Sequence, residues 1–218
     1  YREGDIHDKR VVKERLRFSD VAAILTESLK LKSTRYLILF ILLYKTGEIM
    51  IDVMFKPFVM DAGFSASDTG LWIGTYGMAA SICGSLAGGI LSSSKRPYRG
   101  LLYACVLRLI PLIFETYLTF IQPGAVHIIT ASLLEHFFGG VLTTAVFAFM
   151  MFNVDRIIGA THYTIFASIE VAGKAPGAVL SGFVAQRFGY STCFITGTVI
   201  SVLVIFLLPL YKRSHIEQ

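Results

Sequence analysis

Six long apolar segments follow one another along most of this chain, and they limit strongly what it can fold into. They occupy residues 36–60, 68–92, 100–121, 125–150, 161–186 and 191–211. A helix that crosses a membrane needs about 20 predominantly apolar residues, and each segment meets that length. Six consecutive segments of this kind are hard to explain as the core of a soluble domain. The sequence therefore predicts an all-α, polytopic membrane protein with six transmembrane helices.

The charged residues are few and unevenly spread. They make up 16% of the 218 residues, and 15 of the 35 lie within residues 1–35. The rest are too few to cover a water-soluble globule, which excludes an ordinary soluble domain and a disordered chain. The net charge of +5 comes from basic residues in short loops beside apolar segments, a pattern typical of membrane topology and not of nucleic-acid binding. Cys83, Cys105 and Cys193 each lie inside an apolar stretch, so no disulfide framework is expected.

Four regions can be separated along the chain. Residues 1–17 contain ten charged residues of mixed sign and are predicted to be a solvated linker. Residues 18–34 gather apolar side chains on one helical face, which predicts an amphipathic cytoplasmic helix. This helix either lies on the inner membrane surface or packs as a linker against the transmembrane helices. Residues 35–211 form the predicted bundle and 212–218 a cytoplasmic tail, and we expect a further portion of the protein upstream.

The positive charges set the expected orientation. With the first segment starting inside, the inner loops carry Lys30, Lys32, Arg35, Lys95, Arg96, Arg99, Arg156, Lys212 and Arg213. The outer loops keep Arg187, with Lys56 near an outer end. Cytoplasmic loops are enriched in Lys and Arg, so both ends are predicted to be cytoplasmic. The expected surroundings are membrane lipid, in a multi-pass protein whose membrane the sequence does not identify.

The first three and the last three segments share an order. Each set begins with a segment that contains carboxylates, continues with a glycine-rich one and ends with a plainer one. Because three is an odd number, the second set enters the membrane upside down relative to the first. The sequence therefore predicts two inverted three-helix repeats, an arrangement used by many transporters.

Ionisable residues inside the apolar segments are the strongest pointers to function. The first segment places four of them on one narrow helical face, at spacings of three, four and four: Lys45, Glu48, Asp52 and Lys56. Charges are costly at membrane depth, so this face should point toward other helices or a water-filled cavity. Matching groups in the other segments are Arg108, Glu115, Glu135, His136, Glu170 and Lys174. Together they predict a substrate or ion pathway, and the alternative is a set of ion pairs that only holds the bundle together.

Charge type suggests roles within this pathway. An unpaired buried carboxylate can carry a proton, and the candidates for proton coupling are Glu48, Asp52, Glu135 and His136. The candidates to meet an anionic substrate group are Lys45, Arg108 and Lys174. Arg108 and Glu115, seven residues apart, are expected on one face of the third segment.

Glycine and proline mark two further segments. Six glycines of the second segment, Gly70 to Gly89, are best interpreted as sites of close helix packing. In the fifth segment Gly173, Pro176 and Gly177 predict either a hinge or close packing. Pro111 predicts a bend in the third segment.

Enzyme and metal motifs are missing from the sequence. It contains no H-E-x-x-H, no G-x-S-x-G, no Walker A motif and no paired-cysteine spacing. Adjacent Glu135 and His136 alone are weak evidence for a metal. We therefore expect no enzymatic activity, no cofactor and no metal.

Two stretches resemble known transporter families. Residues 42–48, Leu-Leu-Tyr-Lys-Thr-Gly-Glu, resemble the L-Y-K-x-G-[DE] pattern that opens the second half of AmpG-like permeases and acetyl-coenzyme A transporters. Residues 160–164, Ala-Thr-His-Tyr-Thr, together with 170–174, resemble the branch called major facilitator superfamily domain-containing protein 3. The order of segments and the basic loop 89–99 are similar to the C-terminal half of a major facilitator superfamily transporter, although the loop lacks the superfamily's aspartate.

The resemblance covers residues 18–211 and implies a twelve-helix protein of two bundles that alternates access to a central site. The partner of this chain would be the N-terminal six-helix half of the same transporter. The first and fourth segments would line the cavity, which agrees with the positions of the charged residues. Relatives move amino-sugar peptides or acetyl-coenzyme A, which are both anionic.

The sequence as a whole predicts the C-terminal half of a secondary active transporter for a small anionic organic solute. It would work by proton-coupled or exchange-type alternating access. One alternative is a six-helix channel that needs oligomerisation. The other is an intramembrane enzyme or a scaffold that transports nothing.

Overall fold

The computed structural model describes residues 32–93, 97–154 and 157–216, so the predicted linker 1–17 and most of the predicted amphipathic helix 18–34 lie outside the described residues. Every secondary-structure element in these ranges is a helix. In chain order they are α2 (Lys32–Leu43), α3 (Thr46–Asp61), α4 (Ala66–Thr69), the π-helix η1 (Gly70–Tyr76), α5 (Gly77–Ser92), α6 (Pro97–Leu118), α7 (Ala125–Phe152), α8 (Gly159–Ile205) and α9 (Leu207–Ile216).

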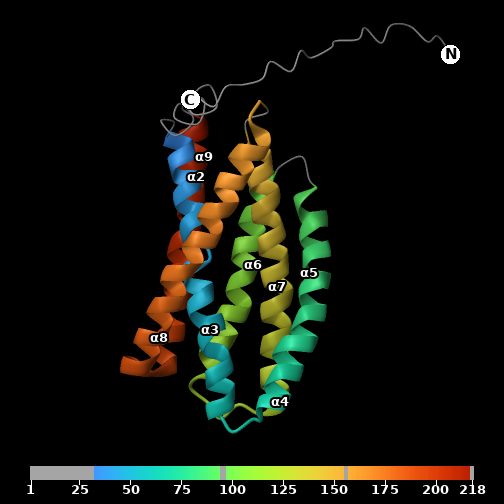
Figure 1. The fold of residues 1–218 in the computed structure, drawn as a ribbon, viewed down its shortest axis with the longest axis vertical. Helices are drawn as coiled ribbons and strands as arrows, with labels where there is room; N and C mark the ends of the chain where they lie inside the picture. Colours follow the sequence, from blue (N-terminus) through green and yellow to red (C-terminus); the bar gives the residue numbers. More distant parts are fainter. Residues whose placement is uncertain (1–31, 94–96, 155–156, 217–218) are drawn as a thin grey trace, which may run out of the picture.

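The helices run up and down the long axis of the molecule. The ribbon descends through α2 and α3, returns through α4 and α5, and continues with α6 and α7 (Figure 1). α8 consists of two helices that meet at Gly189, where a φ of 84° leaves the helical region. Glycine is favoured there because it adopts positive φ without steric cost. As a result, α2 begins and α9 ends at the same end of the bundle (Figure 1). Which side of a membrane that end faces stays a prediction.

Three helical stretches are long and apolar enough to cross a membrane, judged by length and composition. They are Pro97–Leu118, Ala125–Phe152 and Gly159–Ser214, and the last contains the kink. They correspond to the third, the fourth and the combined fifth and sixth expected segments. The first two expected segments are divided among shorter helices. The count of six spans therefore stays a prediction, while the all-helical character is confirmed in the described part of the chain.

The first and second expected segments differ from the prediction of single helices. The first is interrupted at Tyr44 and Lys45, between α2 and α3. The second contains the wider π-helical turns of η1 before it continues as α5. Interruptions of this kind are rare in ordinary helices and are common near functional sites.

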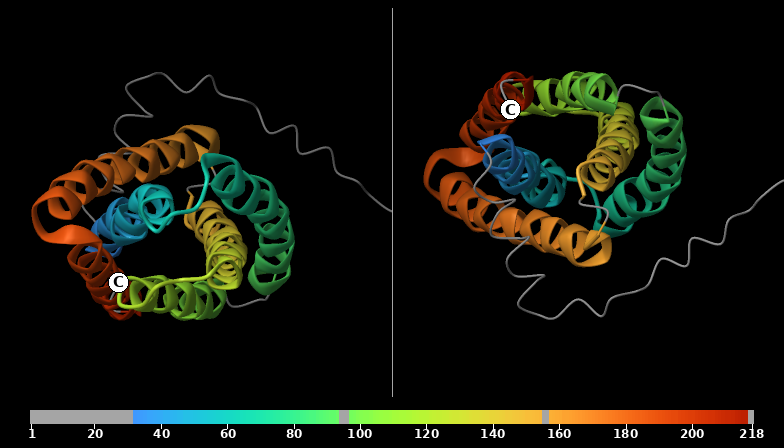
Figure 2. Two further views of the ribbon diagram at one scale, coloured as in Figure 1. Left: turned by 90° about the horizontal axis from the view of Figure 1, so that it is seen from below. Right: turned by 90° about the horizontal axis from the view of Figure 1, so that it is seen from above.

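Helix contacts join elements in a repeated pattern. α3 packs against α8, α2 against α9, α5 against α7, and α6 against α7. In terms of the expected segments, the first therefore packs against the fifth and the sixth. The fourth packs in the same way against the second and the third. Seen along the axis, α3 and α7 face each other between α8 and α5 (Figure 2).

Close backbone contacts follow the same repetition. A Cβ atom at Gly173 or Gly177 of α8 would overlap the backbone oxygen of Leu42 or Thr46. A Cβ at Gly84 or Gly88 of α5 would likewise overlap backbone oxygens of α7. These four glycines lie where helix backbones approach closely, as small residues permit in membrane proteins.

The apolar core is divided into two clusters along the axis. One surrounds Phe40, Leu101, Phe149 and Leu208. The other surrounds Ile51, Leu112, Ile128 and Phe194. Buried ionisable side chains lie between the two clusters along α3, α6 and α7, as at Glu48, Arg108 and Glu135.

Candidate functional site

The site begins at the interruption between α2 and α3. Lys45 lies in this interruption and its Nζ is 3.0 Å from Oε1 of Glu48, one turn into α3. Tyr44, its neighbour, points elsewhere and donates a hydrogen bond to Glu170 at 2.9 Å. The interruption therefore directs two adjacent side chains to two different polar clusters.

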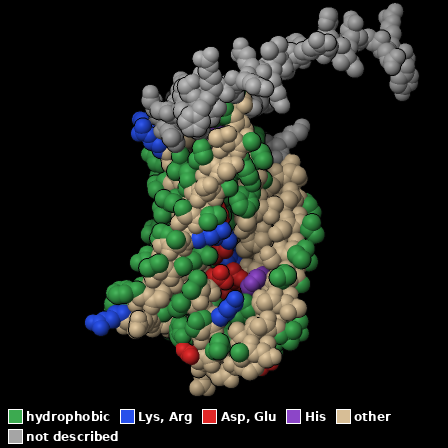
Figure 3. Space-filling view, in the orientation of Figure 1, with side chains coloured by type: hydrophobic (Ala, Val, Ile, Leu, Met, Phe, Trp, Pro, Cys, Tyr) green, Lys and Arg blue, Asp and Glu red, His purple; other side chains and the backbone are tan. Residues whose placement is uncertain are grey.

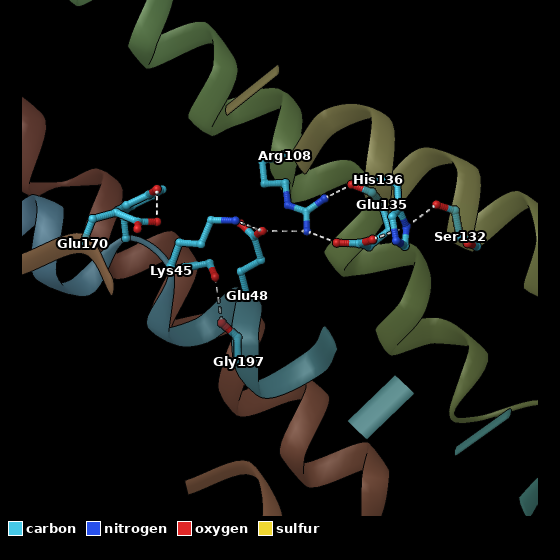
Figure 4. A network of polar contacts seen from close by, with 10 residues as sticks. Lys45, Glu48, Arg108, Ser132, Glu135, His136, Glu170 and Gly197 are labelled. Atoms are coloured by element: carbon cyan, nitrogen blue, oxygen red, sulfur yellow. Dashed lines mark hydrogen bonds and ion pairs between the residues drawn. The ribbon is translucent and has the colours of Figure 1, made fainter. Parts of the chain in front are cut away.

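Arg108 of α6 joins carboxylates from two other helices. Its Nη2 lies 3.2 Å from Oε1 of Glu48 and 2.5 Å from Oε1 of Glu135. Its Nη1 also donates to the backbone oxygen of Glu135. Figure 4 shows the guanidinium between the two carboxylates, with Lys45 on the far side of Glu48. Charge-assisted contacts of this kind are stronger than hydrogen bonds between neutral groups.

His136 extends the network along α7. Its Nδ1 lies 2.5 Å from Oε2 of Glu135 and 2.9 Å from the backbone oxygen of Ser132. A backbone oxygen can only accept, so Nδ1 carries a hydrogen when it bonds to Ser132. The Ser132 hydroxyl donates to the backbone oxygen of Trp72 in η1 at 3.0 Å. A Cβ at Gly77 would overlap the His136 ring, so the start of α5, directly after the π-helix, packs on this histidine.

A cavity of about 210 Å³ opens beside the network. Its lining consists of Lys45, Glu48, Asp52, Ser81, Ser85, Glu135, His136, Gly139, Gly140 and Thr143. In the space-filling view, acidic, basic and histidine side chains gather in a hollow at mid-height of the visible face (Figure 3). Charged groups of α3 and α7, together with Lys45, thus converge on one polar cavity, which is the arrangement expected for intramembrane charges with a function.

Asp52 and Glu115 are placed differently from the other predicted site residues. Asp52 lines the cavity, and the structure records no ion pair for it within the described ranges. Glu115 of α6 is fully buried, and neither of its oxygens has a hydrogen-bond partner among the described residues. It does not line the cavity.

Glu170 and Lys174 form a second cluster on α8. Nζ of Lys174 lies 2.9 Å from Oε1 of Glu170, the same oxygen that accepts from Tyr44. Glu170 is buried, whereas the Lys174 side chain is 37% exposed. Tyr44, together with Glu48 and Arg108 of the main network, lines a small cavity of about 20 Å³.

The predicted hinge residues lie in uninterrupted helices. α6 continues through Pro111, and α8 has helical dihedral angles at Gly173, Pro176 and Gly177. Gly173 and Gly177 contact the backbone of the first segment, as the packing alternative requires. Hinge motion at these positions stays a prediction.

Sequence reasoning missed the uncharged part of the site. Ser81 and Ser85 of α5, and Thr143 of α7, line the cavity but carry no charge that would distinguish them from other small residues. Their spacing of four within a glycine-rich segment was the available signal. The role of Tyr44 was also missed, because an aromatic residue beside a lysine resembles an ordinary packing residue.

The cavity offers groups that can bind protons and groups that can bind anions. Carboxylates and an imidazole can bind protons, and Lys45 and Arg108 can bind anions if their present partners release them. No group of three His, Cys, Asp or Glu side chains that could hold a metal occurs in the part of the chain that the structure describes.

Comparisons with known proteins point to transporters. No protein-family model matches the chain. A protein of Rickettsia prowazekii named as the transporter AmpG 1 is 24% identical over 166 residues, which cover 76% of this chain and 38% of that protein. AmpG 3 of the same organism is 28% identical over 170 residues, with 78% and 40% covered. The anhydromuropeptide permease of Escherichia coli K12 is 25% identical over 179 residues, with 82% and 36% covered.

The chain spans well under two thirds of the length of these relatives. Every one of the three is named as a transporter or a permease. The apolar helices independently indicate a membrane protein. The chain is thus a membrane protein related to AmpG-type transporters.

Proposed function

We propose that this chain is the C-terminal half of a secondary active transporter of the major facilitator type, which moves a small anionic organic solute by alternating access. The observation that carries the proposal is the network of Arg108, Glu48 and Glu135. Three helices each contribute a buried charge to it, at mid-length of the bundle and beside a polar cavity. Burial of such charges is expensive and is typical of substrate or ion pathways.

The arrangement of helices supports a half-transporter. The repeated contact pattern, α3 with α8 and α5 with α7, is the one that two inverted three-helix repeats produce. The hollow of charged residues opens on one face of the bundle instead of being enclosed (Figure 3). The matched relatives are more than twice as long as the matched region. An N-terminal bundle of the same protein would complete the wall of the cavity.

Protons or a counter-substrate would drive the cycle. Glu48, Asp52, Glu135 and His136 all line the cavity, so each is accessible to a proton that enters it. Protonation of Glu135 would weaken its contact with Arg108, and α6 and α7 would be freer to move relative to each other. This supports proton-coupled or exchange-type transport through the main network.

The solute class follows from the cations and the relatives. Lys45 and Arg108 are held by carboxylates, so an anionic group would bind Lys45 by replacing Glu48. One relative is named for an anhydromuropeptide, which favours an amino-sugar-like solute over an acetyl-coenzyme A-like one. Neither the acetyl-coenzyme A family nor the narrower branch of the superfamily appears among the names of the three relatives described above.

An oligomeric channel and a non-transporting scaffold or enzyme are the competing functions. A channel would dissipate a solute gradient and could not accumulate solute against it. A scaffold would have no need for a polar cavity between α3, α5 and α7.

Uptake into proteoliposomes that contain the complete protein tests the proposal. Amino-sugar peptides and coenzyme A thioesters would be offered with and without a pH gradient, and with the counter-solute inside. We expect accumulation above the external concentration of one class. Equilibration without accumulation would indicate a channel, and no uptake of any anionic solute under either condition would contradict the proposal.

A further inference from the structure

Glu115 is the most completely buried acidic residue of the described part of the chain, and the transport cycle proposed above gives it no role. Its relative exposure is 0%, and neither carboxyl oxygen has a hydrogen-bond partner among the described residues. Leu112 and Leu118, one turn away on either side of it in α6, are both buried in an apolar cluster. Ile128 of α7 and Ile51 of α3 belong to the same cluster. The carboxyl group therefore sits in apolar surroundings without a partner.

The charged groups around Glu115 come from three helices. They are Glu135 of α7, Arg108 of α6 itself, and Asp52 and Glu48 of α3. α5, which also contacts α6, contains no ionisable acid or base besides Cys83. In α8, Glu170 and Lys174 pair with each other, and Glu170 also accepts from Tyr44. That helix also carries His162, Tyr163, Arg187, Tyr190 and Cys193, and Cys193 belongs to the same apolar cluster as Leu112. Thr198 of α8 contacts Thr116, the residue after Glu115, through a neutral hydroxyl pair.

Arg108 is the one cation among these four groups. Its Nη atoms are engaged by Glu48 and Glu135. Its Nε has no partner among the described residues. Lys45 is bound to Glu48 as well. Even with His136 protonated beside Glu135, the cations would only balance the carboxylates of Glu48, Asp52 and Glu135, so no positive charge is left to compensate an ionised Glu115.

We propose that Glu115 is a proton-carrying site whose carboxyl group stays protonated while Arg108 is bound to Glu48 and Glu135, and that it ionises when the guanidinium moves to it. An unpaired carboxylate in apolar surroundings is strongly disfavoured, whereas a neutral carboxylic acid is tolerated. Upon ionisation the O–H bond of Glu115 breaks, its proton passes to a water molecule, and the remaining carboxylate pairs with Arg108. The carboxylate that Arg108 leaves must then take up a proton or another cation. Glu115 thus deepens the proposed transport function by adding a proton site outside the cavity lining.

Infrared spectroscopy of the purified complete protein tests the first half of the proposal. A protonated carboxyl group gives a C=O stretching band that an ionised one lacks. We expect that Glu115→Gln removes such a band at neutral pH. Asp61→Asn is the matched control, because Asp61 is exposed at the C-terminal end of α3, and its exchange should remove no such band. A spectrum of Glu115→Gln that keeps the whole wild-type band would overturn the proposal.

Two further variants make the test complete. If Glu115→Gln does not fold, Glu115→Asp should shift the band instead of removing it, and an unshifted band would count against the proposal. Glu135→Gln tests the second half, because it releases Arg108 for Glu115 and should weaken the Glu115 band. An unchanged band in that variant would show that Arg108 does not control Glu115. These measurements need neither substrate nor gradient, so they can be interpreted whether or not the uptake experiment succeeds.

Discussion

Arg108 is the residue on which the charged network depends. It is almost completely buried and is the common partner of Glu48 on α3 and Glu135 on α7. Because a buried ion pair loses hydration, its net contribution to stability is small, but removal of one partner leaves an uncompensated charge. The network is therefore better explained by function than by stabilisation of the fold.

We predict that Arg108→Gln lowers the stability of the protein by about 3–5 kcal/mol, because Glu48 and Glu135 lose their shared cation. Thermal unfolding in detergent, followed by the exposure of buried cysteines, measures this as a lower apparent Tm. Arg99→Gln is the control, since Arg99 is exposed near the start of the same helix and should change stability by less than about 0.5 kcal/mol. Equal effects of both variants would contradict the role of Arg108.

We predict that Glu48→Gln and Glu135→Gln each reduce pH-driven uptake by about ten-fold or more. Each removes a charge-assisted hydrogen bond of about 1.5–3 kcal/mol, and 1.4 kcal/mol corresponds to a factor of ten. Asp52→Asn should also reduce uptake, because Asp52 lines the same cavity. Initial rates of uptake with and without a pH gradient measure the effect. Unchanged uptake in all three variants would show that these carboxyl groups are not part of the proton pathway.

The identity of the site residues could be predicted from the sequence, but their partners could not. Glu48, Arg108 and Glu135 stand out because ionisable residues are rare within apolar segments. Their mutual distances depend on how helices distant in the sequence pack together. The second cluster illustrates this, because the contact of Glu170 with Tyr44 joins residues far apart in the sequence, and the membership of Glu170 in the pathway stays a prediction.

At the scale of the helices, close packing depends on glycines that meet a neighbouring backbone. Gly88 of α5 lies against Val141 of α7, where an added Cβ would fall under 3 Å from backbone atoms. Gly89, the next residue, has open space around its Cβ position. The two adjacent glycines therefore differ in how closely a neighbouring helix packs on them, a difference that the sequence alone does not reveal.

We predict that Gly88→Val destabilises the protein by about 1–3 kcal/mol or more, because α5 and α7 must move apart. Gly89→Val is the matched control and should leave stability nearly unchanged. Apparent Tm in detergent and the yield of monodisperse protein measure both. A Gly88→Val variant as stable as Gly89→Val would mean that the two helices do not pack as described.

The types and approximate positions of the helices could be predicted from apolar length, and their interruptions could not. α6 and α7 agree closely with the expected segments 100–121 and 125–150. The interruption at Tyr44 and Lys45 coincides with contacts from Gly173 and Thr46, which are set by the packing of α8 on the first segment. The kink at Gly189 falls between the expected segments 161–186 and 191–211, whereas α8 continues through Pro176, where the sequence suggested a hinge or close packing.

At the scale of the whole molecule, a polar layer separates two apolar clusters. The bundle has buried hydrophobic side chains toward both ends and buried charges between them. The cavity opens from this layer between α3, α5 and α7. A transporter that opens its two ends in turn requires such a polar layer, because the layer can hold a polar solute at mid-membrane.

The central claim, that the charged side chains line a pathway reached by water, can be tested by cysteine accessibility in liposomes. Ser85 of α5 lines the cavity, whereas Cys83, two residues away, is exposed on the surface of the same helix, where a membrane-embedded bundle would meet lipid and not water. We predict that Ser85→Cys, made together with Cys83→Ser, reacts with a water-soluble, membrane-impermeant thiol reagent, and that Cys83 in the native protein does not. A Ser85→Cys variant that stays unreactive, or a native Cys83 that reacts equally fast, would contradict the account.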